Sequence, residues 1–209
     1  MDPWVYPRER SLGIITLALG LLVWVLLVLG TLGIALIYVL FGFIAYVFAQ
    51  SAVIAWIKGT AVKLSPTQLP ELHARFQACC GYLGIEEPPE AYLLHGDGIF
   101  NAFATRFFGR DFVVLLSDVV DAMETQPDGI NFYIGHELGH IRRGHLTGHI
   151  WRAPVLWIPL LGAAYSRAQE YTCDLHGAAC CEQADSPSRA LVALAAGSMV
   201  RATRLVSQG

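Results

Sequence analysis

Charged residues are scarce in this chain, and one long segment lacks them altogether. They make up 15% of the sequence, against 55% hydrophobic residues, and the mean hydropathy is +0.48. From Ser11 to Ile57 no residue is charged. This composition is too apolar for an ordinary soluble domain, so it predicts a membrane segment near the start of the chain.

An excess of basic residues is also missing. The chain has 14 Lys and Arg against 17 Asp and Glu, which gives a net charge of −3 and a pI of about 6.1. Proteins that bind nucleic acid need a basic surface to neutralise phosphates. We therefore expect no nucleic-acid partner.

No two cysteines have the Cys-x-x-Cys spacing of a zinc or redox motif. Five cysteines are present, which is an odd number, and we expect them to be free thiols that serve packing. Cys173 lies near the motif described below, but we expect it to pack there and not to bind metal.

The uncharged segment is too long to be one membrane helix. As a single helix it would measure about 70 Å, more than twice a hydrocarbon core of about 30 Å. We expect a break at Gly30–Gly33 and two spans, at about 11–29 and about 34–57. A cleaved signal peptide is the alternative, but its apolar region would extend over only about 7–15 residues.

Basic residues flank both ends of this predicted transmembrane hairpin. Arg8 and Arg10 precede it, and Lys58 and Lys63 follow it. Because basic residues favour the cytoplasmic side, we expect a multi-pass integral membrane protein with both termini there, and with the domain that follows the hairpin on the same side. The predicted domains are a membrane anchor with two transmembrane helices (1–63) and a second domain (64–209).

The remaining sequence predicts a mostly α, α+β domain. Two or three strands are expected, with candidates at 91–95, 100–107 and 112–116, and they would form a small antiparallel sheet. A helix expected from about residue 129 to 148 contains the sequence His136-Glu137-Leu138-Gly139-His140.

Two histidines four residues apart on a helix direct their imidazoles at one point. His136 and His140 can therefore bind zinc, and a third protein ligand would leave one position open for water. Glu137 stands beside them and can take a proton from that water as it attacks a carbonyl group. The motif thus predicts metal-assisted amide hydrolysis.

A second helical segment offers the third ligand. Glu170 and Asp174 are four residues apart, so Glu170 could bind zinc while Asp174 accepts a hydrogen bond from a ligand histidine. Arg167 shares their face and could brace a carboxylate or form a surface ion pair. On a continuous helix, His145 and His149 would lie about 180° and 220° from His136, too far round to share its metal.

These motifs carry a family resemblance. His136 to His140, the segment Tyr165–Asp174 and Asn101-Ala102-Phe103-Ala104 together resemble the gluzincin family of HtpX-type heat-shock proteases and CAAX prenyl proteases, over roughly residues 65 to 180. The resemblance implies a zincin-like fold with one Zn²⁺ per chain. It also implies a role for each matching position: the zinc ligands His136, His140 and Glu170, the general base Glu137, the hydrogen-bond partner Asp174, and the substrate-binding edge strand at Asn101, Ala102 and Phe103.

We interpret the chain as a membrane-bound zinc metalloendopeptidase that cleaves membrane or misfolded proteins, with residues 64–209 as the zinc metalloprotease domain and its active site on the cytoplasmic side. Its partners would be peptide or protein substrates and the lipid bilayer. CAAX processing would need a large membrane chamber, which two spans cannot build. No histidine follows His176, so the group that stabilises the oxyanion would be Arg189, Arg201 or Asn101. This gap leaves open an alternative, a membrane zinc domain for signalling or interaction with little or no turnover.

Overall fold

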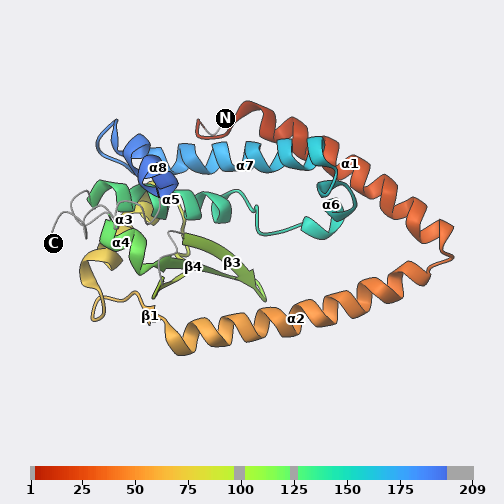
Figure 1. Ribbon diagram of the computed structural model, residues 1–209, viewed down its shortest axis with the longest axis horizontal. Coiled ribbons are helices and arrows are strands. Elements are labelled where there is room, and N and C mark those ends of the chain that lie inside the picture. The colour runs from red at the N-terminus through yellow and green to blue at the C-terminus, as the bar shows by residue number, and fades with distance from the viewer. Residues whose placement is uncertain (1–2, 97–101, 123–126, 197–209) are drawn as a thin grey trace.

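The computed structural model describes residues 3–96, 102–122 and 127–196, and shows a mostly helical α+β protein with one small sheet (Figure 1). The predicted fold class, α+β and mostly α, is confirmed. Along these ranges the elements are α1 (Pro7–Gly30), α2 (Ile34–Thr60), β1 (Val62–Lys63), α3 (Pro70–Tyr82), β2 (Glu90–Leu94), β3 (Ala102–Phe107), β4 (Arg110–Leu116), α4 (Ser117–Ala122), α5 (Pro127–Arg142), α6 (His149–Leu156), α7 (Pro159–Ala179) and α8 (Ser186–Ala196).

The uncharged segment folds as two long helices, with the break where the glycines predict it. Between α1 and α2 the chain turns through Leu32 and Gly33, whose φ angles are 51° and 85°. A left-handed conformation suits glycine, which has no Cβ. Both helices are long and apolar enough to cross a membrane, judged by length and composition. They diverge from the turn as an open V and do not pack along their lengths (Figure 1).

The sheet is mixed, which corrects the prediction of an antiparallel sheet. Its strand order is β1-β2-β4-β3; β3 and β4 form the expected antiparallel hairpin, but β2 and β4 are parallel. The reason is that the chain passes from β2 to the sheet edge, forms β3 there, and returns as β4 beside β2. The core-facing run Phe112–Leu116 is buried along its whole length, as a central strand requires.

Helix α5 is the middle layer of the half of the molecule that contains the sheet, with α7 on one side and the sheet on the other (Figure 1). Its apolar residues join one core with α3 and the sheet, and those that are buried are Ile130, Phe132, Tyr133, Ile134 and Leu138. Phe132 and Tyr133 also pack edge to face, with ring centroids 5.8 Å apart. The helix that carries the histidine motif is therefore held rigidly.

Two glycines allow α5 and α7 to approach closely. A Cβ on Gly135 would lie 2.9 Å from the Cα of Gly177, and a Cβ on Gly177 would lie 2.7 Å from the carbonyl oxygen of Phe132. These contacts are with backbone, which cannot move aside as a flexible side chain can. The small residues therefore set the distance between the two helices.

Gly177→Ala should separate α5 from α7 and destabilise the protein, because overpacking costs about 1–3 kcal/mol and the gain in helix propensity offsets only about 1. The measurement is the midpoint of thermal denaturation in detergent. Gly81→Ala is the matched control, since nothing lies within 4 Å of a Cβ built on this helical glycine. Equal midpoints for Gly177→Ala and Gly81→Ala would contradict the close approach.

The segment between α5 and α7 packs against the first apolar helix. Trp24 Nε1 donates a hydrogen bond to the carbonyl oxygen of Ile150 at 2.8 Å, and a Cβ on Gly20 would meet the carbonyl oxygen of Trp151 at 2.2 Å. Pro154 lies inside α6 and Pro159 begins α7. Residues 151–165 thus form most of a short helix and the start of another.

Candidate metal centre

The two histidines of the motif meet a carboxylate from α7. His136 and His140 occupy successive turns of α5, with ring centroids 5.1 Å apart. Glu170 Oε2 lies 3.3 Å from His136 Nε2 and 3.9 Å from His140 Nε2. One ligand atom from each of the three residues lies within 4.8 Å of the others. The structure therefore brings together the set that sequence reasoning selected.

Asp174, one turn after Glu170 on α7, fixes the orientation of His136. Its Oδ1 lies 2.9 Å from His136 Nδ1. A hydrogen bond from Nδ1–H to this carboxylate leaves Nε2 of His136 facing Glu170 and His140, and a metal ion would take the place of the proton on Nε2. The carboxylate also makes the imidazole a stronger donor to a cation.

Glu137 is buried beside this cluster and faces the edge of the sheet. Its side chain is 8% exposed, and its carboxylate accepts a hydrogen bond from the backbone N–H of Ala104 in β3. Burial raises the pKa of Glu137 to about 7, against the opposing effect of His136. A carboxyl group with a pKa near neutrality can both take up and release a proton at physiological pH.

The charges around the two imidazoles suit a cation. Burial lowers the pKa of His136, but hydrogen bonds to Asp174 and Glu170 outweigh it and raise the pKa to about 10. The hydrogen bond to His136 lowers the pKa of Glu170. Burial, helped by the charge of His136, lowers the pKa of His140 to about 4, so His140 keeps a neutral ring with a lone pair. Two imidazoles and a carboxylate are a donor set that fits zinc.

Other residues selected from the sequence lie elsewhere. Arg167 is exposed and, within the described ranges, makes no hydrogen bond or ion pair, so the structure does not bring it to Glu170 or Asp174. Asn101 and Arg201 fall outside the described residues, whereas Ala102 and Phe103 begin the edge strand β3. Arg189 is exposed and forms an ion pair with Asp185.

His145 is the residue that sequence reasoning placed wrongly. The helix does not continue to residue 148 but ends at Arg142, and Gly144 then has a φ of 67°. His145 N–H donates to the carbonyl oxygen of His140 at 2.9 Å, so the chain turns back and buries His145 beside His140. Gly144 after two arginines was the available signal, because glycine commonly ends a helix in this conformation.

The cysteines are free thiols, as predicted. Cys173 is fully buried, with its sulfur 3.5 Å from His145 Nδ1. Burial raises the pKa of this thiol far above its usual range. Burial therefore favours the protonated thiol of Cys173, whereas a metal ion binds the thiolate.

Comparison with known protein families agrees with this chemistry. Residues 66–162 match the model of peptidase family M48. The match covers β2 to β4 and all of α5 and confirms the resemblance to HtpX-type membrane zinc metallopeptidases. The M48 match implies a metallopeptidase, a hydrolase that acts on peptides or proteins. It ends before Glu170 and Asp174, so the third ligand of the cluster rests on the geometry. Searches of curated proteins and of solved structures give no match.

Proposed function

We propose that this chain is a membrane-bound zinc metalloendopeptidase in which His136, His140 and Glu170 hold one Zn²⁺ and Glu137 is the general base. The observation that carries the proposal is the convergence of the Nε2 atoms of His136 and His140 on Glu170. The buried carboxyl group of Glu137 lies directly after His136 in the sequence. A purely structural site would need a closed set of ligands and no base. Three protein ligands and an adjacent Glu137 fit a catalytic site better.

Glu137 would move the proton in the reaction. Zinc, when bound, supplies a lowered pKa for a water molecule and polarisation of the scissile carbonyl. Glu137 takes the proton on its carboxylate and later returns it to the leaving amine. The hydrogen bond from Ala104 N–H holds this carboxylate between α5 and β3 while it does so. Asp174 keeps the ring of His136 in the orientation that binding requires.

The edge strand β3 is the proposed substrate-binding element. It is the last strand in the sheet order, and Ala104 in it already contacts Glu137. An extended peptide can add to such an edge through main-chain hydrogen bonds, which places its scissile bond near the base. We propose that Asn101, Ala102 and Phe103 contact the substrate on this strand.

The proposed setting is a membrane, with residues 1–63 as anchor and 64–209 as catalytic domain. Of the most apolar window of each helix, only 17% in α1 and 6% in α2 is buried, so most of this apolar surface is available to lipid. Lys58, in the last turn of α2, and Lys63, in β1, each lie within 3.5 Å of Glu90 in β2. The basic flanks favour a cytoplasmic active site and a cytoplasmic location for both termini.

A reporter fused after Lys63 should show a cytoplasmic location, because the basic residues on both sides of the apolar segment stay on that side. The measurement compares a reporter that is active only in the cytoplasm with one that is active only across the membrane. A second fusion at the turn after Gly30 is the control and should give the opposite result. Activity across the membrane for the Lys63 fusion would overturn the two-span topology.

Asp174→Asn should weaken the site without abolishing it. Losing a carboxylate partner of a ligand histidine costs about 10–100-fold in metal affinity or activity. The measurement is zinc affinity by competition with a chelator, together with turnover. Asp185→Asn, an exposed change outside the cluster, is the control. Wild-type affinity and turnover in Asp174→Asn would show that the contact with His136 has no role in binding.

The function is tested on the full-length protein purified in detergent and incubated with unfolded casein. We expect about one zinc per chain, cleavage of casein, loss of cleavage with a chelator, and recovery when zinc is added back. Zinc binding without cleavage would favour a signalling or interaction role. Cleavage that survives complete removal of the metal would contradict the proposed chemistry.

A further inference from the structure

A buried glutamate connects the first apolar helix to the metal cluster. Glu9, in the first turn of α1, has a side chain that is 8% exposed. Its carboxylate accepts hydrogen bonds from Thr172 Oγ1, from His145 Nε2 at 3.2 Å and from Arg143 at 3.3 Å. The backbone N–H of Tyr6 also donates to Thr172 Oγ1 at 3.0 Å. The start of α1 is thus built into the contact between α5 and α7.

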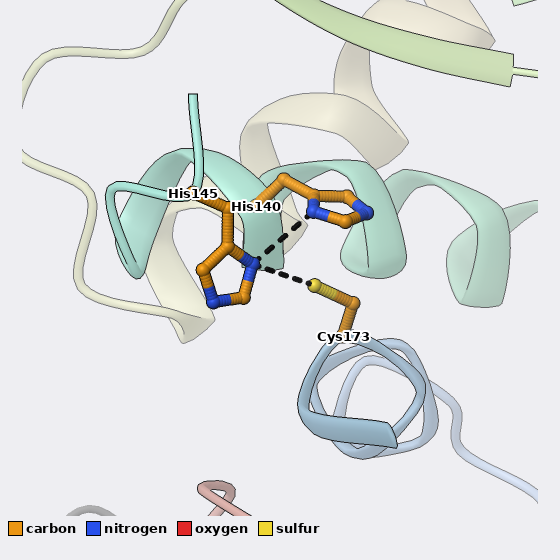
Figure 2. Close-up of side chains that lie close together, drawn as sticks. All are labelled: His140, His145 and Cys173. Carbon is orange, nitrogen blue, oxygen red and sulfur yellow. Dashed lines mark hydrogen bonds between the residues drawn. The ribbon is translucent and has the colours of Figure 1, made fainter. Parts of the chain in front are cut away.

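The other nitrogen of His145 faces a proposed zinc ligand. His145 Nδ1 lies 3.2 Å from His140 Nδ1, and Figure 2 shows this nitrogen facing both the ring of His140 and the sulfur of Cys173. The contacts therefore form one continuous hydrogen-bond relay through Glu9, His145 and His140. This relay begins in the proposed membrane anchor and ends at the cluster of His136, His140 and Glu170.

Only one arrangement of protons allows hydrogen bonds at both contacts of His145, with His140 and with Glu9, when His140 binds metal through Nε2. A neutral His140 then carries its proton on Nδ1 and donates it to His145 Nδ1. His145 consequently carries its proton on Nε2 and donates it to the carboxylate of Glu9. His145 Nδ1, the acceptor in this arrangement, also faces the sulfur of Cys173, and the charged carboxylate of Glu9 strengthens the hydrogen bonds that lead to it.

We propose that Glu9 and His145 are positioning residues that orient His140 as a metal ligand, so that the membrane anchor forms part of the catalytic site. This inference rests on the proposed zinc site. Packing alone would not call for these residue types, because burying a carboxylate is costly and an apolar side chain would fill the same space. A ligand histidine, by contrast, commonly gains affinity from a partner on its second nitrogen.

The test uses the protein in detergent and five variants: Glu9→Gln, Glu9→Ala, His145→Ala and two exposed controls, of which His149→Ala is the control for the histidine. Glu87→Gln is the exposed control for the glutamate. For each we would measure zinc affinity by chelator competition, the visible absorption of the cobalt-substituted protein, and thermal denaturation of the metal-free protein. The cobalt spectrum reports ligand geometry, which a change in packing alone would leave unaltered.

We expect zinc affinity to fall about 10–100-fold in His145→Ala and Glu9→Ala, with an altered cobalt spectrum. Glu9→Gln should lose less, because its amide oxygen still accepts the Nε2–H of His145. Both controls should match the wild type. Glu9→Gln has nearly the shape of the original residue, so it keeps the test informative even if Glu9→Ala does not fold.

Unchanged affinities and spectra in Glu9→Ala, Glu9→Gln and His145→Ala would overturn the inference, and so would a loss of metal-free stability with no change in affinity. Two zinc ions per wild-type chain, one of them lost in Cys173→Ala, would also overturn it, since His145 would then be a ligand itself. A wild-type protein that binds no zinc would contradict the proposed function, whereas a zinc-binding wild type with unaffected variants contradicts only the role of Glu9 and His145.

Discussion

Glu137→Gln should reduce turnover by at least about 10²-fold while zinc stays bound. The variant keeps the size of the side chain but removes the carboxylate that accepts the proton, and a positioned base contributes about 10²–10⁴-fold. Glu137 is not one of the three residues whose ligand atoms converge, so His136, His140 and Glu170 can still hold the zinc in this variant. The measurement is casein cleavage and zinc content on the same detergent-purified sample.

Glu87→Gln, an exposed change from the same residue type, is the control and should cleave as the wild type does. Loss of zinc from Glu137→Gln would show that Glu137 is a ligand or holds the site together. Cleavage at the wild-type rate would mean that the activity comes from another site or from a contaminant. Either result would refute the assigned role.

Removing any one of the three ligands should abolish zinc binding and turnover together. His136→Ala, His140→Ala and Glu170→Ala each leave two donors, which cannot hold the ion in the same geometry. The measurement is zinc per chain after dialysis, followed by casein cleavage with zinc added back. We expect no detectable turnover in these variants at zinc concentrations that saturate the wild type.

His149→Ala is the matched control, because this histidine is exposed at the start of α6. It should keep wild-type zinc and turnover. Glu170→Ala is the most informative of the three ligand variants, since Glu170 lies outside the segment that matches family M48. If Glu170→Ala bound and cleaved normally, the third ligand would have to be a different residue.

Local sequence signals predicted much of this structure. Each pair of site residues lies on one helix, and a spacing of four residues places both members on the same face. The structure confirms this for His136 and His140 in α5, and for Glu170 and Asp174 in α7. The break near Gly30 and the hairpin between β3 and β4 are likewise local, because turn residues specify them.

Long-range features could not be predicted in the same way. The parallel pairing of β2 and β4 depends on the route of the chain between them, which strand patterns do not contain. The partners of Glu9 are also long-range, because nothing near Glu9 in the sequence reveals His145 or Thr172. The predicted direction of His145 is wrong because the helix ends at Arg142 and the chain turns at Gly144. Residues after this turn no longer follow the angular spacing of a helix.

X-ray absorption at the zinc edge of the wild-type protein tests the central claim most directly. If His136, His140 and Glu170 hold the ion, the spectrum should show only nitrogen and oxygen neighbours at about 2.0–2.2 Å. The His140, His145 and Cys173 cluster is the competing group of potential ligands, and it would add a sulfur at about 2.3 Å. A sulfur neighbour that disappears in Cys173→Ala would contradict the account, and its absence in the wild type would support it.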